Sequence, residues 1–282
     1  MLYDVNGRIL YNDKAADFSN NMELDYAYDS ATGANYTVIR VFKTKRDGTK
    51  QYPFVRYPGR MRTAALMADE NWLLAINAGV GLSEEWAAGL GRGSTYTDLI
   101  DGVAIENGVV IAGNPAEYHA GAIPLTIDAN GDLGTAAADA TGASLIASNT
   151  VSNGKITSGI VSATCGFCPI IEDYALTESF PTVSNVTHFT DNAQRQIIGQ
   201  WGNGDYAIIS CAGRNMQNSD GWTLAEAQTV CQKLGLKFAY NLDGGTSTST
   251  YLGKKPVWDF QGGSRIVPSF IVFNGSDQYA AP

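Results

Sequence analysis

Short β-branched and aromatic runs, separated by glycine-containing turns, constrain the fold of this chain most. Asn107-Gly108 separates the apolar runs Gly102–Ile105 and Val109–Ile111, and Asn130-Gly131 follows Leu125–Ile127 in the same way. An Asn-Gly pair between two such runs favours a hairpin, because both central residues of a type I′ turn need positive φ. Glycine accounts for 31 of 282 residues, above the usual fraction of roughly 7%. The sequence therefore predicts a strand-rich fold.

The first 60 residues are polar and contain one clear strand. Tyr36–Phe42 is rich in β-branched and aromatic residues, which is typical of a strand. We interpret Lys43–Lys50 as a hairpin turn around Asp47-Gly48, and Gln51–Tyr57 as the return strand. We divide the chain into a strand-rich N-terminal segment, residues 1–60, and one domain, residues 61–282. The N-terminal segment is either an appendage or the first strands of the main sheet.

A helix followed by a strand is predicted near the C-terminal end. Thr223 and Glu226 fit a capping box at the start of Trp222–Leu234, and Gly235 fits its C-cap. Phe238–Leu242 then has the composition of a buried strand. Together with the hairpins this predicts an α+β fold of mixed β-sheets with a few packed helices.

The acidic balance excludes some partners. Nineteen basic and 28 acidic residues give a net charge of −9, so we expect no nucleic-acid partner, because that affinity comes mainly from Lys and Arg. No apolar run reaches the ~20 residues of a membrane helix. Residues 1–7 lack the features of a signal peptide. Three explanations stay open: the protein is cytoplasmic when made, a signal peptide has already been removed, or the protein leaves the cell by another route such as lysis.

Cysteine and histidine are too few for most metal sites. Cys165 and Cys168 have the spacing of half a zinc site or of a redox pair; a disulfide, a metal or no special role stays open for them. Cys211 and Cys231 are expected to be buried free thiols. There is no Gly-x-Ser-x-Gly elbow, Walker loop or dinucleotide fingerprint. We expect no metal and no cofactor, although acidic loops leave a carboxylate-bound calcium ion open.

The most informative stretch is Asp243–Ser249, which follows the predicted strand Phe238–Leu242. A carboxylate followed by two glycines and several hydroxyls lets backbone approach a sugar or an anion closely. Arg195 and Arg214 lie near the ends of another predicted strand pair, Arg195–Gly199 with Tyr206–Cys211. An arginine fork suits phosphate oxygens. The alternatives are an ordinary Asp-Gly-Gly turn and arginines in surface salt bridges.

Six segments occur in one order over about residues 70–275. They are Asn77-Ala78-Gly79, Arg195–Gly199, Gly213-Arg214, Gly221–Leu224, Asn241–Ser247 and Ser264–Val267. Together they resemble the motifs of the phosphodiester glycosidase family, and the most distinctive, Asn241–Ser247, is similar to the family's Asn-Leu-Asp-Gly-Gly-Gly-Ser.

The resemblance implies a hydrolase that cleaves the glycosidic bond of a sugar-1-phosphodiester, such as an N-acetylglucosamine-1-phosphodiester or a teichoic-acid-like glycan, to free sugar and a phosphomonoester. Asp243 is the expected carboxylate at the anomeric carbon, with Glu106 and Asp101 as distant reserves. The leaving phosphate needs electrostatic stabilisation. The residues expected to supply it are Arg195, Arg214 and Arg265; those expected to contact the substrate are Asn77, Gly79, Gly244, Gly245 and Ser247, together with Arg265.

Three departures from the family pattern affect this interpretation. Ala212 stands where the family often has Asp, Thr246 replaces a third glycine, and Val80-Gly81 replace an aromatic pair. The alternative function is therefore a non-catalytic module that binds carbohydrate or phosphodiester, or a structural module of a phage particle. Such domains also occur in bacterial envelope proteins and in phage-encoded proteins, and a polar N-terminus without a signal peptide fits a phage product. The oligomeric state is not predicted.

Overall fold

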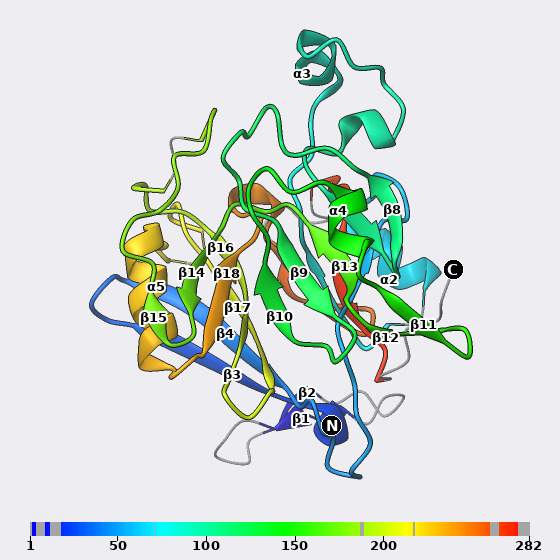
Figure 1. Cartoon of the computed structure of the whole chain (residues 1–282). Coiled ribbons are helices and arrows are strands. Elements are labelled where there is room, and N and C mark those ends of the chain that lie inside the picture. The colour runs from blue at the N-terminus through cyan, green and yellow to red at the C-terminus, as the bar shows by residue number, and fades with distance from the viewer. Residues whose placement is uncertain are drawn as a thin grey trace.

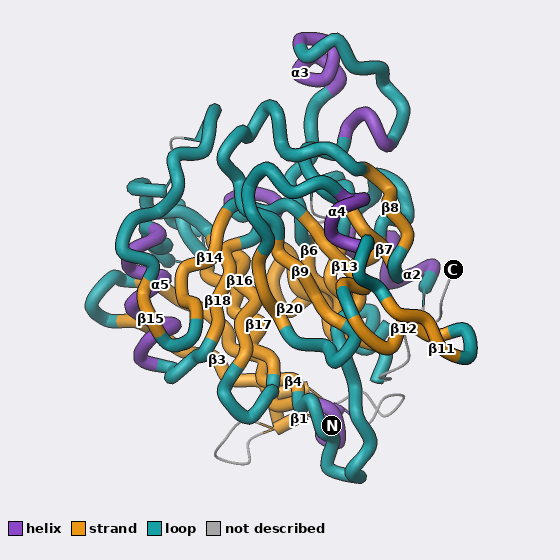
Figure 2. The backbone as a smooth tube through the Cα atoms, in the orientation of Figure 1, coloured by secondary structure: helices purple, strands orange, loops and turns teal. Residues whose placement is uncertain are grey.

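Three antiparallel sheets form the body of the protein in this computed structural model (Figure 1). The structure describes residues 2–3, 9–11, 18–70, 72–186, 189–216, 218–259 and 265–275. Strands fill the middle of the molecule and long loops gather at one end (Figure 2). Five short α-helices accompany the sheets in the described part of the chain, so the predicted α+β class is confirmed.

The largest sheet has seven strands in the order β15-β14-β18-β16-β17-β4-β3. Its strands are β3 (Met22–Asp29), β4 (Ala34–Val41), β14 (Cys168–Glu172), β15 (Ala175–Leu176), β16 (Arg195–Gln200), β17 (Tyr206–Cys211) and β18 (Phe238–Asn241). Because successive strand residues face opposite sides, Ile198 and Ile208 enter the central core while Ile197 and Ile209 pack on the helix side.

Helix α5 (Leu224–Lys233) covers one face of this sheet and begins where the sequence predicts. The Thr223 hydroxyl accepts the Glu226 N–H at 3.2 Å, and the Glu226 carboxylate accepts the Thr223 N–H at 2.8 Å. This capping box satisfies two donors at the helix start. Leu224, Ala227 and Val230 are buried against the sheet, which fixes the helix beside β14 and β18.

Two five-stranded sheets pack on the other face of the largest sheet around the central core. One comprises β5 (Phe54–Arg56), β6 (Leu74–Asn77), β19 (Ser249–Leu252), β20 (Lys255–Asp259) and β21 (Phe270–Phe273). The other comprises β7 (Ala104–Glu106), β8 (Val109–Ala112), β9 (Leu125–Asp128), β10 (Leu133–Thr135) and β13 (Ile160–Thr164). The predicted hairpin β7–β8 forms, with Asn107 at φ 51° and Gly108 at φ 81°.

The remaining elements are short. They are the pairs β1 (Leu2–Tyr3) with β2 (Ile9–Tyr11) and β11 (Thr150–Ser152) with β12 (Lys155–Ser158), the helices α1 (Phe18–Asn21), α2 (Thr63–Asp69), α3 (Glu84–Gly89) and α4 (Gly142–Ile146), and the 3₁₀ turns η1 (Thr97–Leu99) and η2 (Gly245–Ser247). In the described part of the chain, α5 is the longest helix at ten residues, and no helix could span a membrane.

The predicted pairing of Tyr36–Phe42 with Gln51–Tyr57 is wrong. The turn forms, since Lys45 N–H donates to Thr49 O at 2.7 Å, but β4 pairs with β3 and β17 instead. The Gln51 side chain donates to the carbonyls of Asn21 and Phe42, and Pro53 has no N–H to continue a ladder. The chain then crosses to the neighbouring sheet, where β5 pairs with β21.

All four cysteines are buried free thiols, so the disulfide considered for Cys165 and Cys168 is not formed. Burial raises the pKa of each of these two thiols to about 12. Both therefore stay protonated at neutral pH, and the redox reactivity that needs a thiolate is suppressed.

Candidate active site

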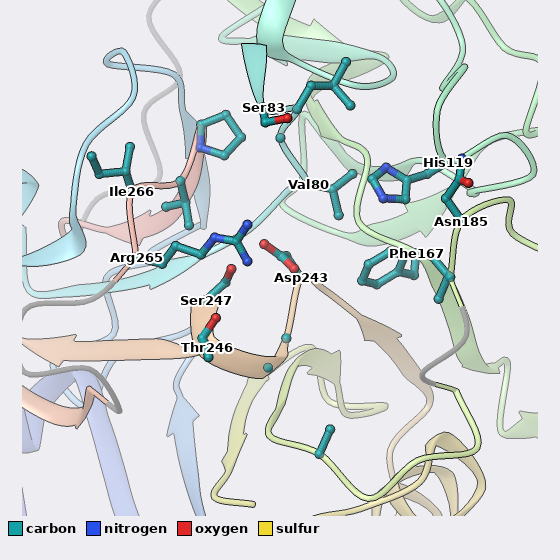
Figure 3. Close-up of a pocket in the computed structure, with 18 of the residues that line it drawn as sticks. Val80, Ser83, His119, Phe167, Asn185, Asp243, Thr246, Ser247, Arg265 and Ile266 are labelled. Carbon is teal, nitrogen blue, oxygen red and sulfur yellow. The ribbon is translucent and has the colours of Figure 1, made fainter. Parts of the chain in front are cut away.

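A cavity of about 290 Å³ opens where loops from all three sheets converge. Its walls come from the loop after β6, the Asp243–Ser247 loop after β18, the loop after β17 and the segment that leads into β21. In Figure 3, Asp243 occupies the middle of this cavity, with Arg265 on one side and His119 on the other. The cavity thus gathers residues from distant parts of the sequence.

Asp243 follows directly from β18, and backbone contacts hold it in place. Its N–H donates to Ala78 O at 3.0 Å, and its carbonyl accepts from Asn77 Nδ2 at 2.6 Å. Burial raises the pKa of its carboxyl, whereas the Ser247 hydroxyl, Arg265 and His119 act in the opposite direction. A carboxyl group whose charged form is disfavoured by burial and favoured by groups close to it is typical of a catalytic acid or base.

Asn77 and Gly79 do not line the cavity, contrary to the prediction that they bind substrate. The Asn77 side chain is buried and spans two backbone groups, since its Oδ1 accepts the Ser249 N–H at 2.9 Å. Gly79 N–H donates to Ser269 Oγ at 2.8 Å, and a Cβ at Gly79 would overlap Thr164 Oγ1. Asn77 therefore positions the Asp243 loop from behind, whereas Gly79 packs against Thr164 and Ser269.

Gly244, Gly245 and Ser247, which the sequence predicts to contact substrate, line the cavity. Gly245 N–H donates to Gln194 O at 2.9 Å, and a Cβ at Gly244 would lie 2.8 Å from the same carbonyl. The two glycines therefore let the loop lie directly against the segment that leads into β16. Thr246, in place of a third glycine, also lines the cavity.

Arg195 and Arg214 meet at the cavity wall beside this loop. Arg195 is buried, and its guanidinium donates to Trp222 O at 2.8 Å and to Asp191 O at 2.9 Å. Burial, with a smaller contribution from Arg214, lowers the pKa of Arg195 to about 10. Arg214 is exposed and has φ 54°, a left-handed conformation that costs a non-glycine residue free energy.

Two further arginines, Arg60 and Arg265, line the cavity. Arg265 was predicted from the Ser264–Val267 motif, of which Ser264 lies outside the described residues. Arg60 precedes the bridge between Met61 and Val267 and was not predicted. Among the described lining residues, four guanidinium groups therefore accompany one carboxylate, although the whole chain carries a net charge of −9.

A histidine–aspartate pair at the cavity is the main feature that the sequence reasoning missed. His119 lines the cavity, and its Nδ1 lies 2.8 Å from Asp101 Oδ2. The fully buried Asp101 also accepts the N–H groups of Glu117, Tyr118 and His119. Burial raises the pKa of Asp101, but these hydrogen bonds outweigh it and the pKa is lowered. The His119 ring is therefore held with Nδ1–H toward the carboxylate, which leaves Nε2 to accept a proton.

Other candidates lie away from the cavity. Glu106 pairs with Arg56 and accepts the Tyr57 N–H at 2.8 Å, so this reserve carboxylate is occupied in holding β5. Ala212 packs in a small apolar cluster with Met216 and Val257 and does not line the cavity. The described residues include no cluster of three or more His, Cys, Asp or Glu suited to a metal ion.

Comparisons with known proteins agree with this fold and identify the family. The phosphodiester glycosidase family model matches residues 71–274, and the chain belongs to that family. A search of curated proteins finds no match.

Solved structures share the fold at low sequence identity. The zebrafish N-acetylglucosamine-1-phosphodiester α-N-acetylglucosaminidase catalytic domain, auto-inhibited by its pro-peptide, has a TM-score of 0.63 and 14% identity over 90% of this chain and 82% of its own. A hypothetical protein from Synechocystis has a TM-score of 0.56 and 16% identity, covering 90% and 62%. A putative exported protein from Burkholderia pseudomallei has a TM-score of 0.51 and 12% identity, covering 85% and 74%.

Proposed function

We propose that this chain hydrolyses the glycosidic bond of a sugar-1-phosphodiester and releases free sugar and a phosphomonoester. The substrate is a compound such as an N-acetylglucosamine-1-phosphodiester or a teichoic-acid-like glycan. The observation that carries the proposal is the cavity itself, in which Asp243 lies among arginines and beside the His119–Asp101 pair. Membership of the phosphodiester glycosidase family supports the reaction class.

The arginines suit the leaving group. When the bond between the anomeric carbon and oxygen breaks, its electron pair goes to the phosphate, which becomes a dianion. Cations positioned where this charge develops stabilise the transition state. Arg195 and Arg214 adjoin the Gly244-Gly245 turn on one side of Asp243, and Arg265 points toward Asp243 from another segment (Figure 3). Because a phosphate dianion is a weak base, it needs little protonation as it leaves.

Asp243 and His119 suit the sugar and the water. The anomeric carbon acquires positive charge as the phosphate leaves, and the Asp243 carboxylate stabilises it. A water molecule then forms the new bond to that carbon and gives up a proton. His119 Nε2 accepts this proton, while Asp101 holds the ring and stabilises the imidazolium that forms. The chain's own residues thus stabilise the charges that develop and accept the one proton that water releases.

The test is incubation with a panel of α-linked sugar-1-phosphodiesters that includes N-acetylglucosamine-1-phosphate esters and wall teichoic acid fragments. We expect free reducing sugar and the matching phosphomonoester in equal amounts, and loss of both with Asp243→Asn. Asp139→Asn, which changes an exposed carboxylate outside the cavity, is the matched control and keeps the activity. Binding without products from any ester would favour the non-catalytic binding module instead.

A further inference from the structure

Helix α3 stands on an arm that projects from the sheets (Figure 1). The arm leaves the body after β6 and returns at Ile100, where Leu82 N–H donates to Leu99 O at 2.8 Å and Gly81 bridges Ile100. Ser83 caps the helix by accepting the Trp86 N–H at 3.1 Å. Ser83 and Trp86 both line the cavity, so the arm forms part of its wall.

The Trp86 indole is a fixed aromatic surface at this wall. It stacks on Tyr118 with ring centroids 4.6 Å apart and an interplanar angle of 13°. Tyr118 is held in turn, because its carbonyl accepts from Asn185 Nδ2 at 2.7 Å. Trp86 is nevertheless 38% exposed, and within the described residues its indole N–H has no acceptor. An exposed, immobilised indole with a spare donor loses little entropy on binding.

We propose that Trp86 and its neighbours form a second sugar subsite, so that the substrate is a glycan of at least two sugar units. One face of a pyranose ring carries mostly C–H groups and packs against an indole, while the ring hydroxyls need polar partners. Ser83, Asn185 and the indole N–H supply polar groups next to the stacking surface. This inference rests on the proposed function, because it places the reacting sugar beside Asp243.

The second sugar lies on the side of the reacting sugar away from the phosphate. Arg214 Nη1 would lie 3.6 Å from a Cβ at Gly245, and Arg195 Cα would lie 3.7 Å from a Cβ at Gly244, so these two phosphate-stabilising arginines adjoin the Gly244-Gly245 turn. In Figure 3, Thr246 and Ser83 lie on opposite sides of Asp243. A glycan whose phosphate contacts the arginines therefore extends from its reacting sugar toward Ser83 and Trp86. Cleavage would release an oligosaccharide and not a single sugar.

Calorimetry with two synthetic esters tests the subsite without depending on turnover. The short probe is the methyl phosphodiester of N-acetylglucosamine-1-phosphate, and the long probe carries a second N-acetylglucosamine on the same sugar. Binding is measured in the Asp243→Asn background to prevent hydrolysis. We expect the long probe to bind about tenfold more tightly, the size of one stacking contact. Trp86→Ala should bring the two affinities within about threefold of each other.

Leu90→Ala is the matched control, because Leu90 ends the same helix, is 37% exposed and does not line the cavity. It should keep the tenfold preference. Equal affinity of the Asp243→Asn chain for the two probes, including no binding of either, would overturn the subsite. A preference that survives Trp86→Ala, or one that Leu90→Ala removes equally, would also overturn it. Failure of the proposed reaction is seen separately, as absence of free sugar and phosphomonoester with the otherwise unaltered chain.

Discussion

Replacing Asp101 with Asn tests the role of the His119–Asp101 pair most fully. The Asp101 carboxylate accepts three backbone N–H groups, at 2.8 to 3.3 Å, and the His119 Nδ1–H at 2.8 Å. Asn keeps one acceptor oxygen and turns an NH₂ toward a donor. Hydrogen bonds to a charged group contribute about 1.5–3 kcal/mol each, and part of the set survives. We therefore expect Asp101→Asn to lower the free energy of unfolding by about 2–4 kcal/mol.

Activity should fall further than stability explains. Asn cannot stabilise the imidazolium, so the general-base contribution of about 100- to 10,000-fold in kcat is lost. His119→Gln should lose similar activity with a smaller loss of stability, because Asp101 keeps its backbone donors. The measurements are kcat on the best ester and urea unfolding at pH 7. Asp98→Asn is the control, since Asp98 is half-buried, lies outside the cavity and accepts hydrogen bonds from Thr95. A kcat for Asp101→Asn within threefold of the unaltered chain would refute the reasoning.

The pH dependence of unfolding gives the same prediction a second readout. Hydrogen bonds lower the pKa of Asp101 in the folded chain below its ordinary value of 3.8. Its stabilising contribution is therefore complete above the unfolded-state pKa and is lost as pH falls through the lower folded-state pKa. The stability difference between the unaltered chain and Asp101→Asn should not shrink between pH 7 and about 5, and should shrink only below about 4. A difference that shrinks near pH 6 would point to another group.

Three further predictions concern other parts of the molecule. Burial raises the pKa of Asp243, so its ionised form opposes folding and Asp243→Asn should raise the urea midpoint at pH 7. This gain in stability should vanish as pH falls below the raised pKa toward 3. A gain independent of pH would contradict the prediction. Arg214→Gly should remove the free-energy cost of the left-handed backbone, about 1 kcal/mol, and so raise the midpoint of thermal unfolding. At the same time kcat/KM should fall at least about tenfold, because a cation that stabilises the leaving phosphate is lost. Thr223→Ala should cost about 1 kcal/mol in urea unfolding through the lost cap, with kcat/KM unchanged because α5 does not line the cavity.

Local chemistry made much of the fold predictable. Asn107 and Gly108 both adopt positive φ, as the type I′ turn requires, so the β7–β8 hairpin follows from two residues. The Thr223–Glu226 capping box likewise located α5. These features depend on neighbours in sequence, and a sequence displays such neighbours directly.

Partners distant in sequence were not predictable in the same way. The turn at Asp47-Gly48 forms, but the strand after it does not pair with β4, because β3 and β17 occupy both edges of β4. It pairs instead with β21, which comes more than 200 residues later in the sequence. Strand β3 was also missed, because three of its eight residues are acidic and such residues are uncommon in strands. Helix α4 has only five residues, which leaves little periodicity to detect.

The motifs pointed to several residues that line the cavity, whereas the residues that tertiary packing brings to it were not found from the sequence. Gly244, Gly245 and the three predicted arginines line the cavity. Asn77 was predicted to bind substrate. An amide at a strand end can face either a ligand or the backbone, and the sequence does not distinguish the two. His119 and Asp101 lie 18 residues apart in sequence, on either side of the β7–β8 hairpin, with no spacing rule to reveal the pair. With two histidines in the chain, pairing each with every carboxylate was the available clue.

The most direct test of the central claim identifies which bond breaks. Hydrolysis of the best ester is run in ¹⁸O-enriched water, and the phosphomonoester product is examined by ³¹P NMR, in which ¹⁸O bound to phosphorus shifts the resonance. Attack of water on the anomeric carbon predicts a phosphomonoester free of ¹⁸O. A phosphomonoester that carries one ¹⁸O atom would mean that water attacks phosphorus, and would contradict a glycosidase.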